Sequence, residues 1–355
     1  MKKKNLKVLL SILLTAALVA GAFCISALFR NQIPKPVTGE LNVYFIDVGQ
    51  ADSVFLTCNG ESMLIDGGNA EDAPTVTAFI KKLGIDTLDY VVATHAHEDH
   101  AGGLGGIIPE FTVKKVLSPV KEYNSVCFRN FVKSANEQCG ITLCSAGERW
   151  TLGNAEIYSL WPLDAEDEET NNTSIVLKAV FGAVSYLFCG DLESDAETRL
   201  IETGADLSAN VLKAGHHGSD TSSSYYFLRS VMPQFAIISC GKDNSYGHPH
   251  KSTLEKFEQA DITYYRTDEL GTISSSTDGN RITFTFGSET VTTEAEERTP
   301  ALGEGDVQYI GNINSKKYHL PSCPSLPKEE NRKYFNSKKE AEDAGYSPCG
   351  SCIKN

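Results

Sequence analysis

The sequence predicts a layered α/β protein with one medium-sized domain and one small domain. Short apolar runs from Leu41 onward end at turn signals such as Asp-Gly-Gly, as β-strands do. Helical segments lie between these runs, and the second half of the chain repeats the alternation. The chain has 355 residues, of which 41% are hydrophobic, so it can form a full core and is not globally disordered.

The expected elements follow in chain order. Three strands open the first domain, at 41–46, 53–57 and 62–65. A helix at about 74–83 ends at Gly84, and the apolar run 88–94 is typical of a buried strand. In the second half we expect strands at 174–181, 184–189, 209–214, 235–239, 262–265, 271–275 and 281–286, and helices near 193–202, 222–230 and 251–259.

The N-terminus predicts a membrane anchor or a signal peptide within residues 1–30. Four lysines in the first seven residues precede an uncharged run from Val8 to Phe29. This run has 22 residues, and a bilayer-spanning helix needs about 20. Because positive charge tends to stay cytoplasmic, the rest of the chain is expected outside the cell. The alternative is a cleaved signal peptide, with a cleavage site near Ala20-Gly21-Ala22 and a secreted product.

Charge is distributed unevenly over the expected domains. After a linker at 31–40, residues 36–304 carry 18 basic and 40 acidic residues, a net charge of −22. Such a surface argues against a large sequence-independent DNA-binding surface on the domain at 41–287. Residues 288–305 are polar and predict a second linker, and residues 305–355 carry a net charge of +2.

A metal-binding motif follows the strand at 88–94. His95, His97, Asp99 and His100 fall within six residues, directly before a glycine-rich segment. A loop at the end of a buried strand can direct several side chains to one point, and His and Asp suit divalent zinc or manganese. The spacing lets the first two histidines face one ion and the Asp-His pair face a second.

The stretch Thr94 to Gly103 resembles the signature of the metallo-β-lactamase superfamily. Further motifs resemble one branch of it, the hydrolase domain of ComEC-type DNA-uptake proteins, and they occur in the same order over 41–287: Phe45–Ser53, Leu64–Gly68, Asn172–Ser174, Phe188–Asp191, Lys213–Ser219 and Tyr246–Pro249. The resemblance implies a four-layer αββα sandwich with two divalent metal ions.

The resemblance also implies the roles of individual metal ligands. His95 and His97 would hold the first ion, Asp99 and His100 the second, and Asp191 would bridge them. His216 would complete the second site, with His217 as the alternative. No histidine lies between His100 and His216, so the first ion lacks its usual third histidine. Asn172 stands in that segment and is expected to be a weak ligand.

Other residues are expected to act around the ions. Asp66 and Asp47 would orient ligand histidines. His248 would contact a substrate phosphate or protonate a leaving group, and its alternative reading is a structural turn residue. With Asp99 and Asp191 it completes the expected catalytic set, in which Asp191 positions a metal-activated bridging hydroxide.

The resemblance favours a phosphodiesterase or nuclease that acts on DNA outside the cytoplasm. Two other classes of function remain open. One is a cell-surface esterase or phosphodiesterase with a different substrate, such as a phosphocholine-bearing polymer. The other is a non-catalytic binding protein that retains a metal site. The oligomeric state cannot be predicted from the sequence.

The C-terminal unit, 306–355, contains a second candidate metal site. His319, Cys323, Cys349 and Cys352 have the spacing H-x3-C-x25-C-x2-C, which is typical of a structural zinc site. A disulfide involving these cysteines is the alternative. The unit resembles the metal-binding domain of the Ada DNA-repair protein, but His319 replaces the first cysteine, the methyl acceptor of that protein. Alkyl transfer is therefore not expected.

Overall fold

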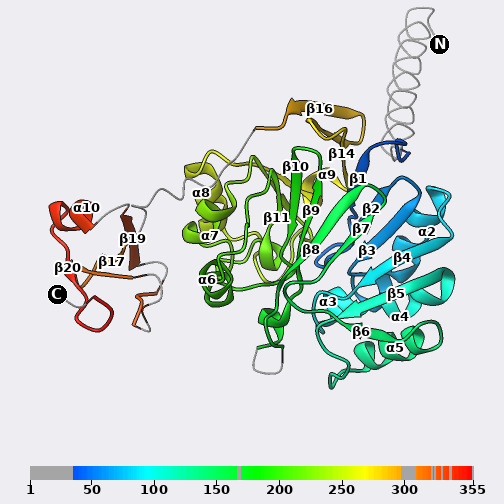
Figure 1. The fold of residues 1–355 in the computed structure, drawn as a ribbon, viewed down its shortest axis with the longest axis horizontal. Coiled ribbons are helices and arrows are strands. Elements are labelled where there is room, and N and C mark those ends of the chain that lie inside the picture. The colour runs from blue at the N-terminus through cyan, green and yellow to red at the C-terminus, as the bar shows by residue number, and fades with distance from the viewer. Residues whose placement is uncertain are drawn as a thin grey trace, which may run out of the picture.

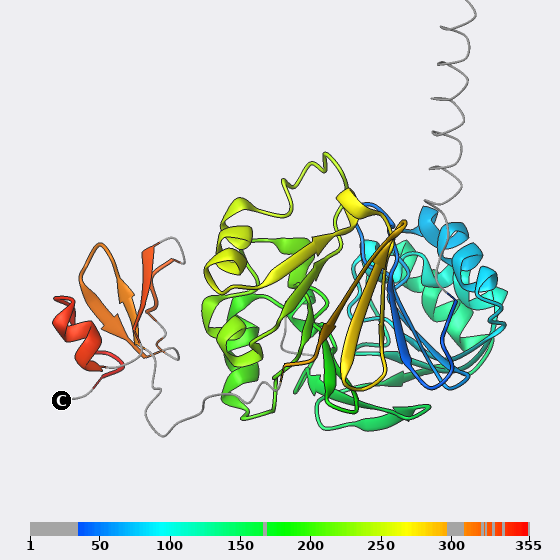
Figure 2. The same cartoon turned by 90° about the horizontal axis from the view of Figure 1, so that it is seen from above.

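The computed structural model describes residues 35–165, 169–296, 309–320, 323, 325–328, 331–335 and 338–353. Two mixed sheets pack face to face, and helices cover both outer faces (Figures 1 and 2). This is the four-layer αββα sandwich that the sequence predicts. The expected anchor at 1–30 lies outside the described residues, and within the described ranges no helix is long and apolar enough to cross a membrane.

The first sheet has nine strands in the order β16-β15-β14-β1-β2-β3-β4-β5-β6. Its strands are β1 (Leu41–Phe45), β2 (Val54–Cys58), β3 (Glu61–Ile65), β4 (Thr87–Val92), β5 (Thr112–Ser118), β6 (Ile141–Leu143), β14 (Ile273–Thr277), β15 (Arg281–Phe286) and β16 (Glu289–Glu294). Four helices belong to this half: α2 (Ala73–Lys82), α3 (Glu98–Ala101), α4 (Leu104–Ile107) and α5 (Val126–Asn136).

The second sheet has seven strands in the order β13-β12-β11-β10-β9-β8-β7. Its strands are β7 (Arg149–Leu152), β8 (Ala155–Trp161), β9 (Val176–Phe181), β10 (Val184–Phe188), β11 (Val211–Lys213), β12 (Phe235–Ile238) and β13 (Thr263–Arg266). The accompanying helices are α6 (Ser194–Glu202), α7 (Tyr225–Val231), α8 (Lys251–Gln259) and α9 (Thr267–Leu270).

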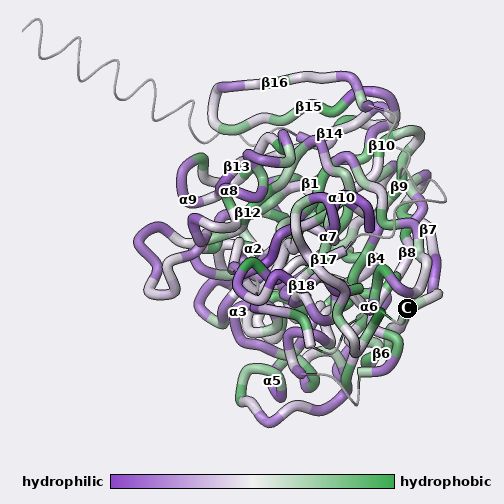
Figure 3. The backbone as a smooth tube through the Cα atoms, turned by 90° about the vertical axis from the view of Figure 1, so that its left-hand side faces the viewer, coloured by the Kyte–Doolittle hydropathy of each residue, from purple (hydrophilic) through white to green (hydrophobic). Residues whose placement is uncertain are grey.

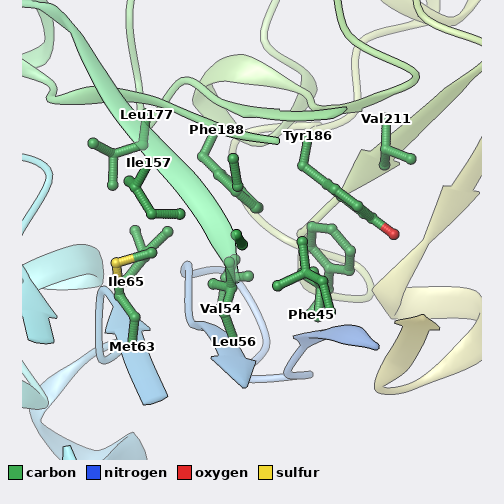
Figure 4. Packing of buried hydrophobic residues seen from close by; sticks show 14 of the residues in the cluster. Phe45, Val54, Leu56, Met63, Ile65, Ile157, Leu177, Tyr186, Phe188 and Val211 are labelled. Carbon is green, nitrogen blue, oxygen red and sulfur yellow. The ribbon is translucent and has the colours of Figure 1, made fainter. Parts of the chain in front are cut away.

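Three hydrophobic cores separate the four layers. The central core lies between the sheets, where Phe45 and Phe188 meet with ring centroids 6.3 Å apart (Figure 4). Side chains alternate along a strand, so Tyr44 points instead into the core under α2 to α5. The third core lies between the second sheet and helices α6 to α8. Strands buried on both faces read as near-continuous apolar runs, which is why the sequence reveals most of them, though not β5 or β8.

The C-terminal unit has its own small sheet and core. The strands β17 (Tyr309–Asn312), β18 (Lys317–His319), β19 (Arg332–Phe335) and β20 (Ser347–Pro348) form a sheet in the order β19-β17-β18-β20, beside helix α10 (Lys338–Asp343). The core centres on Tyr318, Phe335, Ala341 and Tyr346. Helix α10 is largely hydrophilic in Figure 3. So small a core usually needs a metal or disulfide for stability.

The expected linker at 288–305 is partly structured. Residues Glu289–Glu294 form β16, which pairs with β15 as an antiparallel edge strand. The linker was predicted because this segment is polar and has no apolar pattern, and β16 has none because it is an exposed strand. Thr283 and Thr292 face each other across the pair, and such cross-strand contacts stabilise an exposed ladder. The remainder, 297–305, lies outside the described residues.

Candidate metal centre

The metal-binding residues meet at one shared edge of the two sheets. Strands β3, β4 and β5 run parallel in the first sheet, and β10, β11 and β12 run parallel in the second. The loops after β3, β4, β10, β11 and β12 therefore leave from carboxyl ends of parallel strands. A hydrogen bond from Ile175 N to Thr94 O, 2.8 Å long, links the sheets at this edge. All the histidine motifs lie on these loops.

Four side chains form a compact cluster suited to one ion. Ligand atoms of Asp99, His100, Asp191 and His217 all lie within 4.8 Å of one another. His100 Nε2 and Asp191 Oδ1 lie 3.1 Å apart, and both are buried without a hydrogen-bond partner among the described residues. Buried polar atoms are rarely left unsatisfied. A cation held between these two atoms would satisfy both, so the residues present fit a divalent metal ion.

The electrostatics of this cluster also favour a cation. Burial alone would lower the pKa of His217, but the carboxylates of Asp191 and Asp52 outweigh burial and raise that pKa to about 10. Burial opposes ionisation of Asp191 as well, yet His100 and His217 hold its pKa well below the usual value. Carboxylates and imidazoles thus favour each other's charged forms, and a divalent ion could replace the protons on the imidazoles.

Asp66 lies where a residue that orients a ligand must lie. Its Oδ2 is 2.8 Å from His100 Nδ1, which leaves the other ring nitrogen facing Asp191. Thr94 holds the Asp66 carboxylate by two hydrogen bonds of 2.7 Å, one from its backbone N–H and one from its hydroxyl.

Gly190, directly before Asp191, lies where only glycine fits. It has φ of 52° and packs against Ser174 and Thr94, where a Cβ atom would lie 2.8 Å from Ser174 Oγ.

The first predicted ion site is less complete than the second. His95 Nε2 and His97 Nδ1 lie 3.1 Å apart, and His95 Nε2 lies 3.9 Å from Asp191 Oδ2. The pKa of His95 is well below its usual value because of burial and the neighbouring His100, so its ring is neutral and able to bind a metal. These three side chains can share an ion, and a further ligand is needed.

Asn172 does not supply that ligand. Its Oδ1 accepts a hydrogen bond of 3.0 Å from Glu193 N, and its backbone oxygen accepts one of 2.7 Å from Trp161 Nε1. The side chain therefore fixes the backbone after Asp191 and does not line the metal pocket. Its neighbour Asn171 does line the pocket, and the Asn171 Oδ1 atom is buried without a hydrogen-bond partner among the described residues. Asn171 is therefore better placed than Asn172 to act as a weak amide ligand.

The structure also reverses the order of His216 and His217. His217 is buried, and its Nε2 lies 3.2 Å from Asp99 Oδ2, while its Nδ1 lies 3.0 Å from Ser239 O. That backbone contact aims Nε2 at the cluster. His216 remains outside the four-ligand cluster and is partly exposed, with its Nδ1 3.4 Å from Glu193 Oε1. Both histidines have positive φ, so the backbone reverses direction here and turns the two rings apart.

Asp47 does not orient a ligand histidine. It is exposed, and its Oδ1 accepts a hydrogen bond of 3.2 Å from Gly49 N, as in a local Asx turn. Asp52, five residues later, occupies the buried position instead. Its Oδ1 lies 3.4 Å from His217 Nδ1, and its Oδ2 lies 2.8 Å from the buried Lys213 Nζ. Asp47 and Asp52 both lie in the motif Phe45–Ser53, so the sequence contained Asp52 as a candidate that the prediction did not consider.

A small pocket opens beside the cluster. Its volume is about 330 Å³, and it is lined by Gln50, His97, Glu98, Asp99, Asn171, Asp191, His216, His217, Tyr246 and His248. Among the described residues, no lysine or arginine lines it. Bound ions would therefore add positive charge for an anionic substrate to that of the histidines in the lining. The volume is near the lower end of the usual range for ligand pockets, about 300–1,000 Å³.

The C-terminal candidates converge on a separate point. The ligand atoms of His319, Cys323, Cys349 and Cys352 lie within 4.8 Å of one another. Burial opposes ionisation of Cys349, but backbone N–H groups of Ser351 and Cys352 lower its pKa to about 7, toward the thiolate that binds metals. Among the described residues the cysteines are free, so the disulfide alternative is not observed in this structure.

If His217 rather than His216 is the metal ligand, variants of these two histidines should differ in the number of ions that they bind. His217→Ala should remove about one ion per molecule, because it removes a ligand of the four-residue cluster, whereas His216→Ala should retain both ions. His95→Ala should also lose one ion, and Asp191→Ala should weaken both sites. Elemental analysis of purified, folded protein measures this, with His250→Ala as the control. The assignment is wrong if folded wild-type protein binds no metal or if only His216→Ala loses an ion.

Comparison with known proteins agrees with this geometry. Residues 46–242 match the metallo-beta-lactamase superfamily, and residues 304–354 match the metal binding domain of Ada. The chain is 29% identical over 279 residues to ComE operon protein 3 of Bacillus subtilis, covering 73% of this chain and 36% of that protein. It is 30% identical over 250 residues to the competence protein ComA of Neisseria gonorrhoeae, covering 69% and 34%.

The chain thus spans about a third of the length of these curated relatives. Among solved structures, the metallo-beta-lactamase fold protein YhfI of Bacillus subtilis aligns with 71% of this chain and 100% of its own, at 9% identity and a TM-score of 0.44. The superfamily match extends from the end of β1 past β12 and includes every loop that contributes to the metal cluster. The chain therefore belongs to the metallo-beta-lactamase superfamily.

Proposed function

We propose that the large domain is a metal-dependent phosphodiesterase that acts on DNA. The observation that carries the proposal is the cluster of Asp99, His100, Asp191 and His217, with its two unsatisfied buried atoms, beside a small pocket without lysine or arginine. A pocket of this size can admit one phosphodiester group, and the positive charge of bound metal ions would attract that anion. The relatedness to proteins named for competence favours nucleic acid as the source of that group.

Zinc or manganese ions, when bound, supply positive charge for the phosphoryl oxygens and a water of lowered pKa. The side chains then hold the reactants in place. Asp191 is itself fixed through its backbone N–H, which donates a 2.9 Å hydrogen bond to Ser174 Oγ. Because its carboxylate reaches both sets of histidines, Asp191 sets the geometry of the whole centre.

His248 is suited to hold the substrate. Burial and the nearby His250 and His216 lower the pKa of His248 to about 4, so its ring is neutral at neutral pH. A neutral ring can donate a hydrogen bond to a phosphoryl oxygen but carries no readily transferable proton. Of the two roles expected for His248, phosphate binding therefore fits better than protonation of a leaving group, and we assign His248 to phosphate binding.

His216 is better placed to deliver a proton. Its Nε2 lies 3.7 Å from Asp191 Oδ2, at the pocket, while its Nδ1 lies beside Glu193 and Thr221. The hydrogen bond with His216 lowers the pKa of Glu193, so this carboxylate is ionised and can hold the imidazole in place. We assign His216 to protonation of the leaving oxygen.

Hydrolysis of a small diester tests the activity. Protein from residue 35 onward, loaded with zinc or manganese, should cleave bis-p-nitrophenyl phosphate and DNA. Asp191→Asn should lower kcat by at least about 100-fold, because even residues that only orient ligands contribute about 10–100-fold. The exposed Asp195→Asn is the matched control. Cleavage of a phosphocholine ester but of neither diester would contradict the proposal and favour the cell-surface alternative.

We also propose that the C-terminal unit contributes affinity for long DNA. The large domain is strongly acidic, whereas residues 305–355 carry a net charge of +2. Deleting 305–355 should raise KM on long DNA and leave kcat on the small diester nearly unchanged, because a remote contact binds ground state and transition state equally. Cys349→Ser should act like the deletion, since a small zinc-dependent unit unfolds without a ligand, and Cys139→Ser is its control. Equal KM values for the truncated and full-length proteins on long DNA at low salt would exclude this role.

Both catalysis and binding are proposed to take place outside the cytoplasm, at the cell membrane or after secretion. The proposal rests on the lysine-flanked apolar run at the N-terminus. Protease added to intact cells should therefore degrade residues 36–355, and the protein should be found in the membrane or extracellular fraction. Recovery in the cytosol alone would refute both the anchor and the signal peptide.

A further inference from the structure

A groove lies beside the metal centre, between helix α5 and the loop that precedes it. The volume of the groove is about 900 Å³, and its walls come from Lys121–Asn124 and from one side of α5. The loop follows β5, whose carboxyl end lies beside that of β4, so it shares an edge with the loop of His95 and His97. The ring of Tyr123 lies 6.3 Å from the ring of His97. Tyr123 is thus where the groove and the metal centre meet.

The charge of the groove is opposite to that of its domain. Residues 36–304 have more than twice as many acidic as basic residues, yet the groove is lined by three basic residues and two acidic ones. Arg129 and Lys133 are four residues apart and so share one face of α5. Lys121 forms no ion pair within the part of the chain that the structure describes. Lys133 has only a long, exposed contact with Glu137, 3.9 Å, which solvent screens.

The floor of the groove is apolar and aromatic. Tyr123 and Val132 are half-buried against the core, and Phe128 is fully buried beneath them. The rings of Tyr123 and Phe128 are 6.0 Å apart. Binding sites for single-stranded nucleic acids combine such aromatic surfaces with a basic groove along the backbone. In a duplex the base faces are stacked inside the helix and cannot reach this floor.

We infer that the groove binds nucleotides of a single-stranded polynucleotide next to the phosphodiester held in the metal pocket. The inference rests on the proposed function and names its substrate form. Lys121, Arg129 and Lys133 bind backbone phosphates, while Tyr123 stacks against a base at the entrance to the metal centre. The groove therefore forms a basic surface for a short single-stranded polynucleotide within an otherwise acidic domain. It extends from the metal centre along α5.

Removing charge from the groove tests the inference. The double variant Lys121→Gln/Arg129→Gln is compared with Lys81→Gln/Lys82→Gln, which removes the same charge at the far end of α2. Fluorescence anisotropy of a labelled oligothymidylate measures binding to protein from residue 35 onward. The groove variant should bind about tenfold more weakly at low ionic strength, and the slope of log K against log salt should fall by about 1.4, or about 0.7 for each lost phosphate contact. KM and kcat on bis-p-nitrophenyl phosphate should match those of the control.

Failure of the inference is distinguishable from failure of the proposed function. If the wild-type protein binds the oligonucleotide through the groove but hydrolyses no diester, the proposed activity fails and the groove remains a binding site. If the groove variant and the control bind equally well, or wild-type protein does not bind, the groove inference is overturned. Duplex binding as tight as single-strand binding, with the same loss in the groove variant, would overturn the single-strand assignment.

Discussion

Burial of the Asp191 carboxylate is the constraint on which the metal centre depends. An ionised group removed from water costs several kcal/mol unless it is paired. The fold meets this requirement by bringing His95 and His100 from the segment after β4, and His217 from the loop after β11, around Asp191 at one edge of the two sheets. One carboxylate oxygen still lacks a hydrogen-bond partner among the described residues. A divalent ion would complete the arrangement, so the stability of this edge and its chemistry would depend on the same ion.

A second buried charge pair extends that arrangement into the second sheet. Lys213 Nζ lies 2.8 Å from Asp52, and Asp52 in turn lies beside His217. Burial alone would raise the pKa of Asp52, but Lys213 and His217 outweigh it and lower that pKa below its usual value. Asp52 therefore remains a carboxylate and favours the orientation in which His217 Nε2 faces the cluster. Strand β11 thus ends at Lys213, and the turn that follows it carries His217, the ligand that Lys213 indirectly supports.

Sequence reasoning was strongest where a residue's role follows from local pattern. Most buried strands and the His-x-His-x-Asp-His motif are visible because apolar runs and ligand spacing are local properties. Strands β5 and β8, whose buried and less buried residues are interleaved, were not expected. The choice between His216 and His217 could not be made from the sequence, because it depends on a left-handed turn that aims the second ring toward the cluster. The hydrogen bond that Asn172 Oδ1 accepts from Glu193 N is a tertiary contact, so the sequence could not reveal it. Helix α5 was not among the expected elements. Its groove could not be predicted, because the groove forms between α5 and the loop after β5 and lies near His97 only in the folded chain.

The acidic surface and the small pocket together constrain how a long polyanion can reach the ions. A net charge of −22 over residues 36–304 repels a nucleic acid at long range, although salt screens this over about 8–10 Å. The pocket itself has room for about one phosphodiester group, so neighbouring nucleotides must lie on the surrounding surface. A locally basic surface can hold them with a smaller electrostatic penalty. The ring of Tyr123, which lines the groove, lies 6.3 Å from the ring of His97, which lines the pocket. Repulsion by the acidic surface, together with the basic groove, would favour single-stranded nucleic acid that approaches the ions along α5. The form of the substrate would then depend on the geometry around the metal centre.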